Sequence, residues 1–175
     1  HGLPLGGEAL QVVIETNADS VTGGVDTVYT MLSVYTLGAN VENGVLYTSS
    51  AVNLTGNSLN NVLTSNAGNN VMDGSAGIDT VSYATATSSV TATLASTASQ
   101  NTGGSGLDTL INIENLTGSA YNDSLTGSSA DNVLTGGSGD DVLDGLTGND
   151  TLDGGAGLDT ASYANASAAV NVLLY

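Results

Sequence analysis

Positively charged residues are nearly absent from this chain of 175 residues, which has no lysine, no arginine and a single histidine at position 1. Its seventeen aspartates and glutamates give it a formal net charge of −17 at neutral pH. A chain of this charge is repelled by the phosphates of nucleic acids and by anionic lipid surfaces. Nucleic acid is therefore excluded as a partner. Carboxylates packed into a compact fold need either cations between them or a well-hydrated surface.

Cysteine is absent as well, which excludes disulfides, thiolate chemistry and sulfur-ligated metal sites. Aromatic residues make up 4% of the sequence, so a large conventional core is not expected. No apolar run approaches the roughly 20 residues that a membrane-spanning helix requires, and we expect no membrane insertion. No side chains at a recognisable spacing suggest nucleophilic or acid–base catalysis, so we predict that the chain is not an enzyme.

Glycine is abundant, with 24 residues spread along the chain among Asn, Asp, Ser and Thr. This mixture predicts a tight turn every few residues and disfavours long helices. Residues 118–162 fall into five consecutive nine-residue units that each open with glycine: GSAYNDSLT, GSSADNVLT, GGSGDDVLD, GLTGNDTLD and GGAGLDTAS. A period this strict predicts a repeat architecture.

Two positions of the unit carry most of the pattern. Position six is polar and holds Asp123, Asn132, Asp141, Asp150 and Asp159. Position eight is apolar and holds Leu125, Leu134, Leu143, Leu152 and Ala161. Looser units cover residues 56–82, with Asn61, Asn70 and Asp79 at position six, and residues 103–111, with Asp108.

These units resemble the RTX, or hemolysin-type, calcium-binding nonapeptide GGxGxDxUx, where U is a large apolar residue, and residues 136–144 match it best. The resemblance implies an all-β fold, a right-handed parallel β-roll or β-solenoid in which each unit forms a six-residue turn and a three-residue strand. Two units complete one coil, and the strands stack at about 4.8 Å into two short parallel sheets. Because side chains alternate along a strand, position eight is predicted to point inward.

The resemblance also implies calcium as the cofactor, bound at several sites between stacked turns. Glycines allow φ > 0 and bring carbonyl oxygens close to a cation, and the position-six side chain completes a cage of oxygens, which suits Ca²⁺. Units two apart lie on the same side of the roll, which stacks Asp123, Asp141 and Asp159 along one edge and Asn132 with Asp150 along the other. The residues predicted to hold calcium are Asp79, Asp108, Asp123, Asn132, Asp141, Asp150 and Asp159, with Gly136, Ser138, Gly145, Thr147, Gly154 and Ala156 in the turns.

Other roles remain open for some polar residues. A position-six aspartate can act as an Asx-type turn residue that bonds its own backbone, and the asparagines of the looser tract can stack without metal. Position-nine Asp73, Asp144 and Asp153 point outward in this roll and are predicted to form a solvated edge that deters sheet-to-sheet pairing. Glu42 and Glu114 lie in matching VEN and IEN turns of a larger duplication, so we interpret them as structural.

The pattern divides the chain into a degenerate repeat and strand region at 1–55, a first roll module at 56–102 and a second at 103–175, unless these form one continuous solenoid. One hypothesis is a secreted or cell-surface bacterial protein that self-assembles into a surface layer, adhesin stalk or extracellular filament through exposed position-seven valines. The alternative is a calcium-dependent module of a type I secreted enzyme or toxin whose catalytic part lies outside this chain. Ice or mineral binding by a threonine-rich face is disfavoured, because positions seven and nine mix Val, Ser, Asp and Thr.

Overall fold

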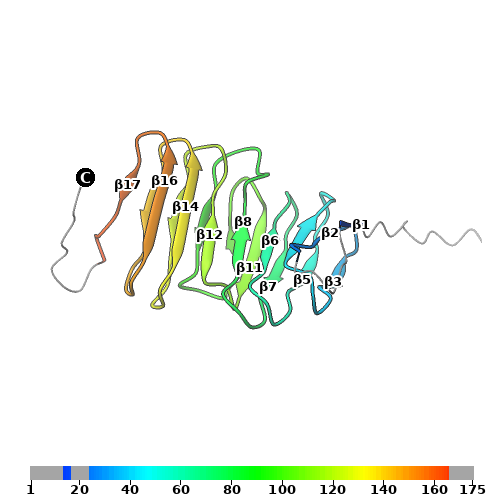
Figure 1. Ribbon diagram of the computed structural model, residues 1–175. Helices are drawn as coiled ribbons and strands as arrows, with labels where there is room; N and C mark the ends of the chain where they lie inside the picture. The colour runs from blue at the N-terminus through cyan, green and yellow to red at the C-terminus, as the bar shows by residue number, and fades with distance from the viewer. Residues whose placement is uncertain (1–13, 17–23, 166–175) are drawn as a thin grey trace, which may run out of the picture.

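The computed structural model describes residues 14–16 and 24–165, and within these the chain consists of strands and turns, with no helix that could span a membrane. The short strands stack into an elongated roll with two layers (Figure 1). One layer is a single eight-stranded sheet, which we call sheet A. In spatial order its strands are β1 (Ile14–Thr16), β2 (Thr27–Thr30), β4 (Asn43–Leu46), β6 (Val62–Thr64), β8 (Thr80–Ser82), β12 (Asn115–Thr117), β14 (Val133–Ser138) and β16 (Thr151–Ala156).

The opposite layer is divided into two sheets. Sheet B contains, in spatial order, β10 (Gln100–Asn101), β11 (Leu107–Ile111), β7 (Val71–Asp73), β5 (Asn53–Thr55) and β3 (Val34–Thr36). Sheet C contains β17 (Thr160–Ala161), β15 (Val142–Asp144), β13 (Ser124–Thr126) and β9 (Thr91–Thr93). Strand pairs in the described part are parallel except β1 with β2 and β10 with β11. The predicted parallel β-roll is confirmed, but the layer expected to be one sheet is two.

Apolar side chains from the strand centres fill the space between the two layers. Leu134 lies beside Leu116 and Leu152 on neighbouring strands of sheet A, and Leu125 lies beside Leu143 in sheet C. Leu125 and Leu134 are fully buried. Because side chains alternate along a strand, the preceding residues face outward, and Val133 and Val142 are 44% and 43% exposed. The predicted inward position eight is confirmed for Leu125, Leu134 and Leu143, while Leu152 is half-buried and Ala161 is exposed near the end of the described roll. The predicted outward position seven is confirmed for Val62, Val133 and Val142, and Val71 is half-buried.

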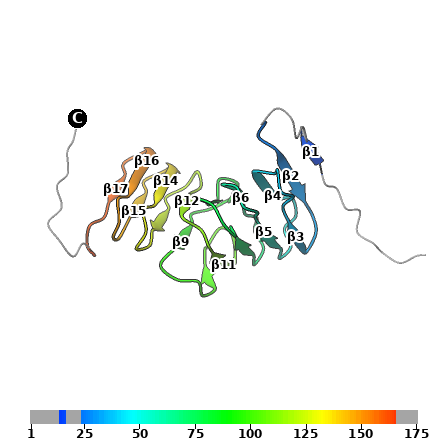
Figure 2. The same cartoon turned by 60° about the horizontal axis from the view of Figure 1, so that its bottom comes forward.

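The regular winding is interrupted between β8 and β12 (Figure 2). Strand β9 pairs with β13 further along the roll, β10 and β11 then form an antiparallel pair, and β11 returns to pair with β7. Sheet A continues past this point, because β12 pairs with β8. This excursion is the physical reason why the second layer is divided, and it could not be anticipated from a nine-residue period.

The boundary between sheets B and C, which we call the seam, is held by few backbone contacts. Val90 and Gly103 form an isolated bridge. The side-chain amide of Gln100 accepts the N–H of Thr93 at 2.7 Å and donates to the Thr93 carbonyl at 2.9 Å. A side chain thus stands in for a peptide group where β10 meets β9.

Candidate metal centre at the edges of the roll

The residue immediately before each strand lies at an edge of the roll and binds the backbone of the coil before it. Along sheet A, Asn61 N–H donates to Asp79 Oδ1 at 2.7 Å, and Asn132 N–H donates to Asp150 Oδ1 at 2.9 Å. The acceptor for the next residue of the column is a glutamate: the Asp79 N–H donates to Glu114 Oε2 at 2.8 Å. We call this column the A edge; it comprises Asp26, Glu42, Asn61, Asp79, Glu114, Asn132 and Asp150. The predicted stacking of Asn132 with Asp150 is present.

Along sheet C the corresponding column, the C edge, consists of consecutive carboxylates. The N–H of Asp123 donates to Asp141 Oδ1 at 2.7 Å, and the N–H of Asp141 donates to Asp159 Oδ1 at 3.0 Å. The N–H of Val90 donates to Asp123 Oδ1 at 2.7 Å. The three aspartates predicted to stack therefore do so, and each uses one oxygen to hold the preceding coil.

Glycine at position one of the unit creates a small space beside each carboxylate. A Cβ added at Gly136 would overlap Asp141 Oδ2 and lie 2.6 Å from the carbonyl oxygen of Gly154 in the next coil. A carboxylate oxygen and a carbonyl oxygen from two coils thus converge on one point. Gly145 and Gly154 lie equally close to Asp150 and Asp159. Only a residue without a side chain fits here, and it lets a carboxylate oxygen and a carbonyl oxygen of two coils approach each other, as oxygen ligands of one cation must do.

The electrostatics of these edges also favour a cation. Asp141 Oδ2 and Asp79 Oδ2 are buried and have no hydrogen-bond partner, which is costly for a carboxylate. Burial raises the pKa of Asp141, and the carboxylates of Asp123, Asp159 and Asp140 raise it further. Burial likewise raises the pKa of Asp79, with a contribution from Glu114. A bound cation would satisfy the bare oxygens and offset this repulsion.

The donor set is made only of oxygens. In the described part of the chain no three Asp, Glu, His or Cys side chains gather closely enough to hold an ion by themselves. Backbone carbonyls must therefore supply several ligands, as calcium accepts in its six- to eight-fold oxygen geometry. The residues present fit calcium on these grounds.

The turn residues Ser138, Thr147 and Ala156, which were also predicted as ligands, take part in backbone pairing between coils. Ser138 and Ala156 pair with each other where β14 and β16 extend into the turns, and the Ala156 carbonyl accepts the N–H of Gly139 at 2.9 Å. Thr147 N–H reaches the Ser128 carbonyl at 3.4 Å in the equivalent turn of the other edge. These residues lie beside the carboxylate columns, and in this arrangement the Ala156 carbonyl already serves sheet pairing.

Asn132 differs from its aspartate neighbours because its side chain is already well supplied with partners. Its Oδ1 accepts the N–H of Ser128 at 2.7 Å, and its Nδ2 donates to the Glu114 carbonyl at 2.6 Å. The side chain therefore joins two coils by itself.

Asp108, predicted as a ligand, lies on β11 on the far side of the seam from the C edge. It is fully buried, its Oδ1 accepts the N–H of Asn70 at 2.9 Å, and its Oδ2 accepts the hydroxyl of Thr102 at 3.0 Å. Burial raises the pKa of Asp108 to about 6, against the opposing effect of these donors. Both oxygens of Asp108 accept hydrogen bonds, whereas Asp141 Oδ2 has no donor.

The variant Asp108→Asn should stabilise the protein above about pH 6 and change little below about pH 4. The folded carboxyl retains a proton between pH 3.8 and about 6 that the unfolded chain releases, so its contribution to stability falls as pH rises through this window. We expect a gain on the order of 2 kcal/mol at pH 7.5 in urea unfolding at fixed calcium. A loss of stability together with weaker calcium binding would show that Asp108 holds an ion.

A second ladder, at position five, was missed by the sequence analysis. The N–H of Asp140 donates to Asn122 Oδ1 at 3.0 Å, and the N–H of Leu158 donates to Asp140 Oδ1 at 2.9 Å. Position five thus accepts from the following coil, whereas position six accepts from the preceding one. The recurrence of Asn and Asp at position five is the signal that could have revealed it.

Position-nine aspartates initiate turns. Asp73, Asp144 and Asp153 each accept, through Oδ1, the N–H two residues further on, at 3.0–3.1 Å. They therefore form Asx turns, a more specific role than the solvated edge that was predicted.

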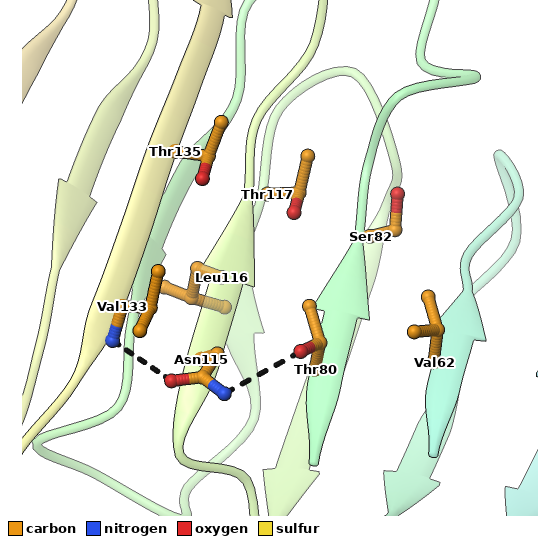
Figure 3. Close-up of a pocket in the computed structure, with 8 residues that line it drawn as sticks. All are labelled: Val62, Thr80, Ser82, Asn115, Leu116, Thr117, Val133 and Thr135. Atoms are coloured by element: carbon orange, nitrogen blue, oxygen red, sulfur yellow. Dashed lines mark hydrogen bonds between the residues drawn. The ribbon is translucent and has the colours of Figure 1, made fainter. Parts of the chain in front are cut away.

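A shallow hollow of about 340 Å³ lies on the outer face of sheet A, over β8 and β12 (Figure 3). Asn115 lies in it; its Oδ1 accepts the N–H of Val133 at 2.8 Å and its Nδ2 donates to Thr80 Oγ1 at 3.5 Å. The lining residues are Val62, Thr80, Ser82, Asn115, Leu116, Thr117, Val133 and Thr135. This set contains no carboxylate, histidine or cysteine, so the hollow offers no acid or base for catalysis.

The family model of the RTX calcium-binding nonapeptide repeat matches residues 53–81, 112–143 and 126–161. The chain carries RTX calcium-binding repeats. The comparison with curated proteins gives no match. The matched segments of the RTX roll include the C edge aspartates and Asp79, while Asp108 lies outside them. An RTX β-roll is a structural calcium-binding fold, and calcium is its expected ion.

Proposed function

We propose that this chain is a calcium-dependent structural module of a secreted or cell-surface bacterial protein, with no catalytic activity of its own. The observation that carries the proposal is the buried Asp141 Oδ2, which has no hydrogen-bond donor and lies beside Gly136 together with the Gly154 carbonyl of the next coil. Several ions would be held in this way between stacked turns, with side chains of Asp79, Asp123, Asp141, Asp150 and Asp159 as principal ligands. Bound calcium would supply the positive charge that the chain itself lacks.

The folding of such a module would be regulated by the surrounding calcium concentration. In a calcium-poor cytoplasm the carboxylate columns repel one another, and the chain stays poorly ordered and able to pass through a secretion channel. Outside the cell calcium joins the turns, and folding follows. Sheet A runs without a break across the predicted boundaries at 55 and 102, which supports one continuous solenoid over separate modules.

Calcium titration of the chain after removal of metal with EGTA should produce a cooperative gain of β-signal in circular dichroism. The expected midpoint lies between about 0.1 and 1 mM, the range of extracellular calcium modules. Magnesium at the same concentration should produce little change, because it prefers a rigid octahedral site. A spectrum that ignores calcium over this range would refute metal-dependent folding.

Self-assembly is a second candidate function. Val62 and Val133 are 38% and 44% exposed on the outer face of sheet A, and among the described residues β16 and β17 end their sheets with unpaired edges. Unpaired edges and exposed apolar groups favour association with further copies. Light scattering during the same titration should rise with calcium if copies assemble. A monomer at saturating calcium would favour instead a folding module attached to a secreted enzyme or toxin.

A further inference from the structure

We propose that calcium orders the turns that lead into the strands of sheet C, whereas the turns that lead into the strands of sheet B are held without metal by side-chain amides and hydroxyls, and that the seam separates these two regimes. The inference rests on the calcium binding proposed above and states which turns depend on the ion. It follows from the different side chains that occupy the equivalent edge columns of the two sheets.

The column along sheet B satisfies its own oxygens. Asn70 Oδ1 accepts the N–H of Val52 at 3.1 Å, as an aspartate would. Its Nδ2 then donates to the Gly68 carbonyl at 2.9 Å, to Asn66 Oδ1 at 3.0 Å and to Ser65 Oγ at 3.1 Å. The amide NH₂ thus attracts the turn oxygens that a cation would otherwise gather.

The next position along the same column is Asp108, and it too is supplied with donors by the protein. Its partners are the Asn70 N–H and the Thr102 hydroxyl, so neither of its oxygens is left bare. The column along sheet B therefore contains one carboxylate, and that carboxylate needs no ion.

The column along sheet C is supplied with such donors at Asp123 alone, which accepts the N–H and the hydroxyl of Ser119, whereas Asp141 Oδ2 has no donor. Asp123, Asp141 and Asp159 follow one another at every coil, and a carboxylate accepts hydrogen bonds but cannot donate them. Asp141 Oδ2 is buried without a donor and lies beside Gly136 together with the Gly154 carbonyl of the next coil. Acidic residues are also denser in the part of the chain that contains β13, β15 and β17. Eight lie in residues 118–165, against six in residues 24–117, a stretch about twice as long.

The seam allows the two sheets to respond separately. Sheets B and C share no paired strands, and their contact passes through the Val90–Gly103 bridge and the Gln100 side chain. Loss of order in β13 and β15 therefore does not remove backbone partners from β5 or β7.

Hydrogen exchange of the full chain, followed by mass spectrometry in EGTA and in calcium, tests this division. Peptides that cover β5 and β7 should exchange at rates within about twofold in the two conditions. Peptides that cover β13 and β15 should be protected at least tenfold more in calcium. An equal response of both sheets, with calcium binding confirmed by calorimetry, would overturn the inference and leave the proposed function standing.

A matched pair of isosteric variants gives the sharper test. Asp141→Asn keeps the acceptor for the Asp123 N–H, brings a donor to the Gly154 carbonyl and removes one of three stacked charges. Protection of β13 and β15 in EGTA should therefore rise severalfold, although one of the proposed ligands has been lost. Asn70→Asp makes the reverse change, and β5 and β7 should lose protection in EGTA by a similar factor.

The outcomes separate the two proposals. If calorimetry detects no calcium binding, the proposed function fails, while a difference in protection between sheets B and C in EGTA still measures the effect of the amides. If Asp141→Asn lowers the protection of sheet C in EGTA, the amide does not replace the ion and the inference fails. Because Asp141→Asn is expected to add order, its result does not depend on whether Asn70→Asp folds.

Discussion

Replacement of Gly136 by alanine is expected to lower the free energy of unfolding by about 3 kcal/mol in saturating calcium, at the upper end of overpacking effects. The added Cβ would overlap Asp141 Oδ2 and lie 2.6 Å from the Gly154 carbonyl, so both coils must move apart. Calcium affinity of the chain should fall with stability, since the same two oxygens define the candidate site. Urea unfolding in calcium, with calorimetric titration of the ion, measures both effects.

Gly38→Ala is the matched control for this substitution. The nearest atom to a Cβ added at Gly38 is Val41 Cγ2, at an ordinary contact distance of 3.7 Å. This change should be neutral, or stabilising by about 0.5 kcal/mol through the lower entropy of the unfolded chain. Equal losses in the two variants would show that the convergence of oxygens beside Gly136 has no special importance.

Leu134→Ala is expected to cost about 3 kcal/mol or more, within the usual range for a buried leucine. Leu134 is fully buried, and its neighbours Leu116 and Leu152 belong to strands whose spacing is fixed by sheet hydrogen bonding. The roll cannot collapse around the cavity without breaking that pairing, which keeps the cost high. Thermal unfolding in calcium provides the measurement.

Val133→Ala, one residue away on the same strand, controls for the effect of the truncation on strand propensity. Val133 is 44% exposed on the outer face, so we expect a loss below about 1 kcal/mol. If both variants lost the same stability, the assignment of position eight to the interior and position seven to the surface would be wrong in solution.

The repeating elements of the fold could be predicted because they depend on local chemistry repeated at a fixed spacing. Leu125 and Leu134 at position eight, and the columns that contain Asp141 and Asp150, follow from alternation along a strand and from two units per coil. The leucines and the two columns lie where the nine-residue period predicts them.

The seam and the setting of Asp108 could not be predicted, since each depends on partners far away in the sequence. Strand β9 pairs with β13, and Asp108 accepts the N–H of Asn70, 38 residues earlier. The local sequence GGSGLD around Asp108 matches a calcium turn as well as GGAGLD around Asp159 does. Asp159 likewise accepts the N–H of Asp141, so the Thr102 hydroxyl is the donor that sets Asp108 apart.

The seam also determines how the roll carries a mechanical load. In the described chain, sheet A is paired without a gap from β2 to β16, whereas the opposite layer is joined at the seam by one backbone bridge and one glutamine side chain. A bending force that opens sheet B away from sheet C breaks few hydrogen bonds, while bending in the other sense compresses packed strands. The roll is therefore a stiff rod with one compliant joint, hinged along sheet A between β8 and β12.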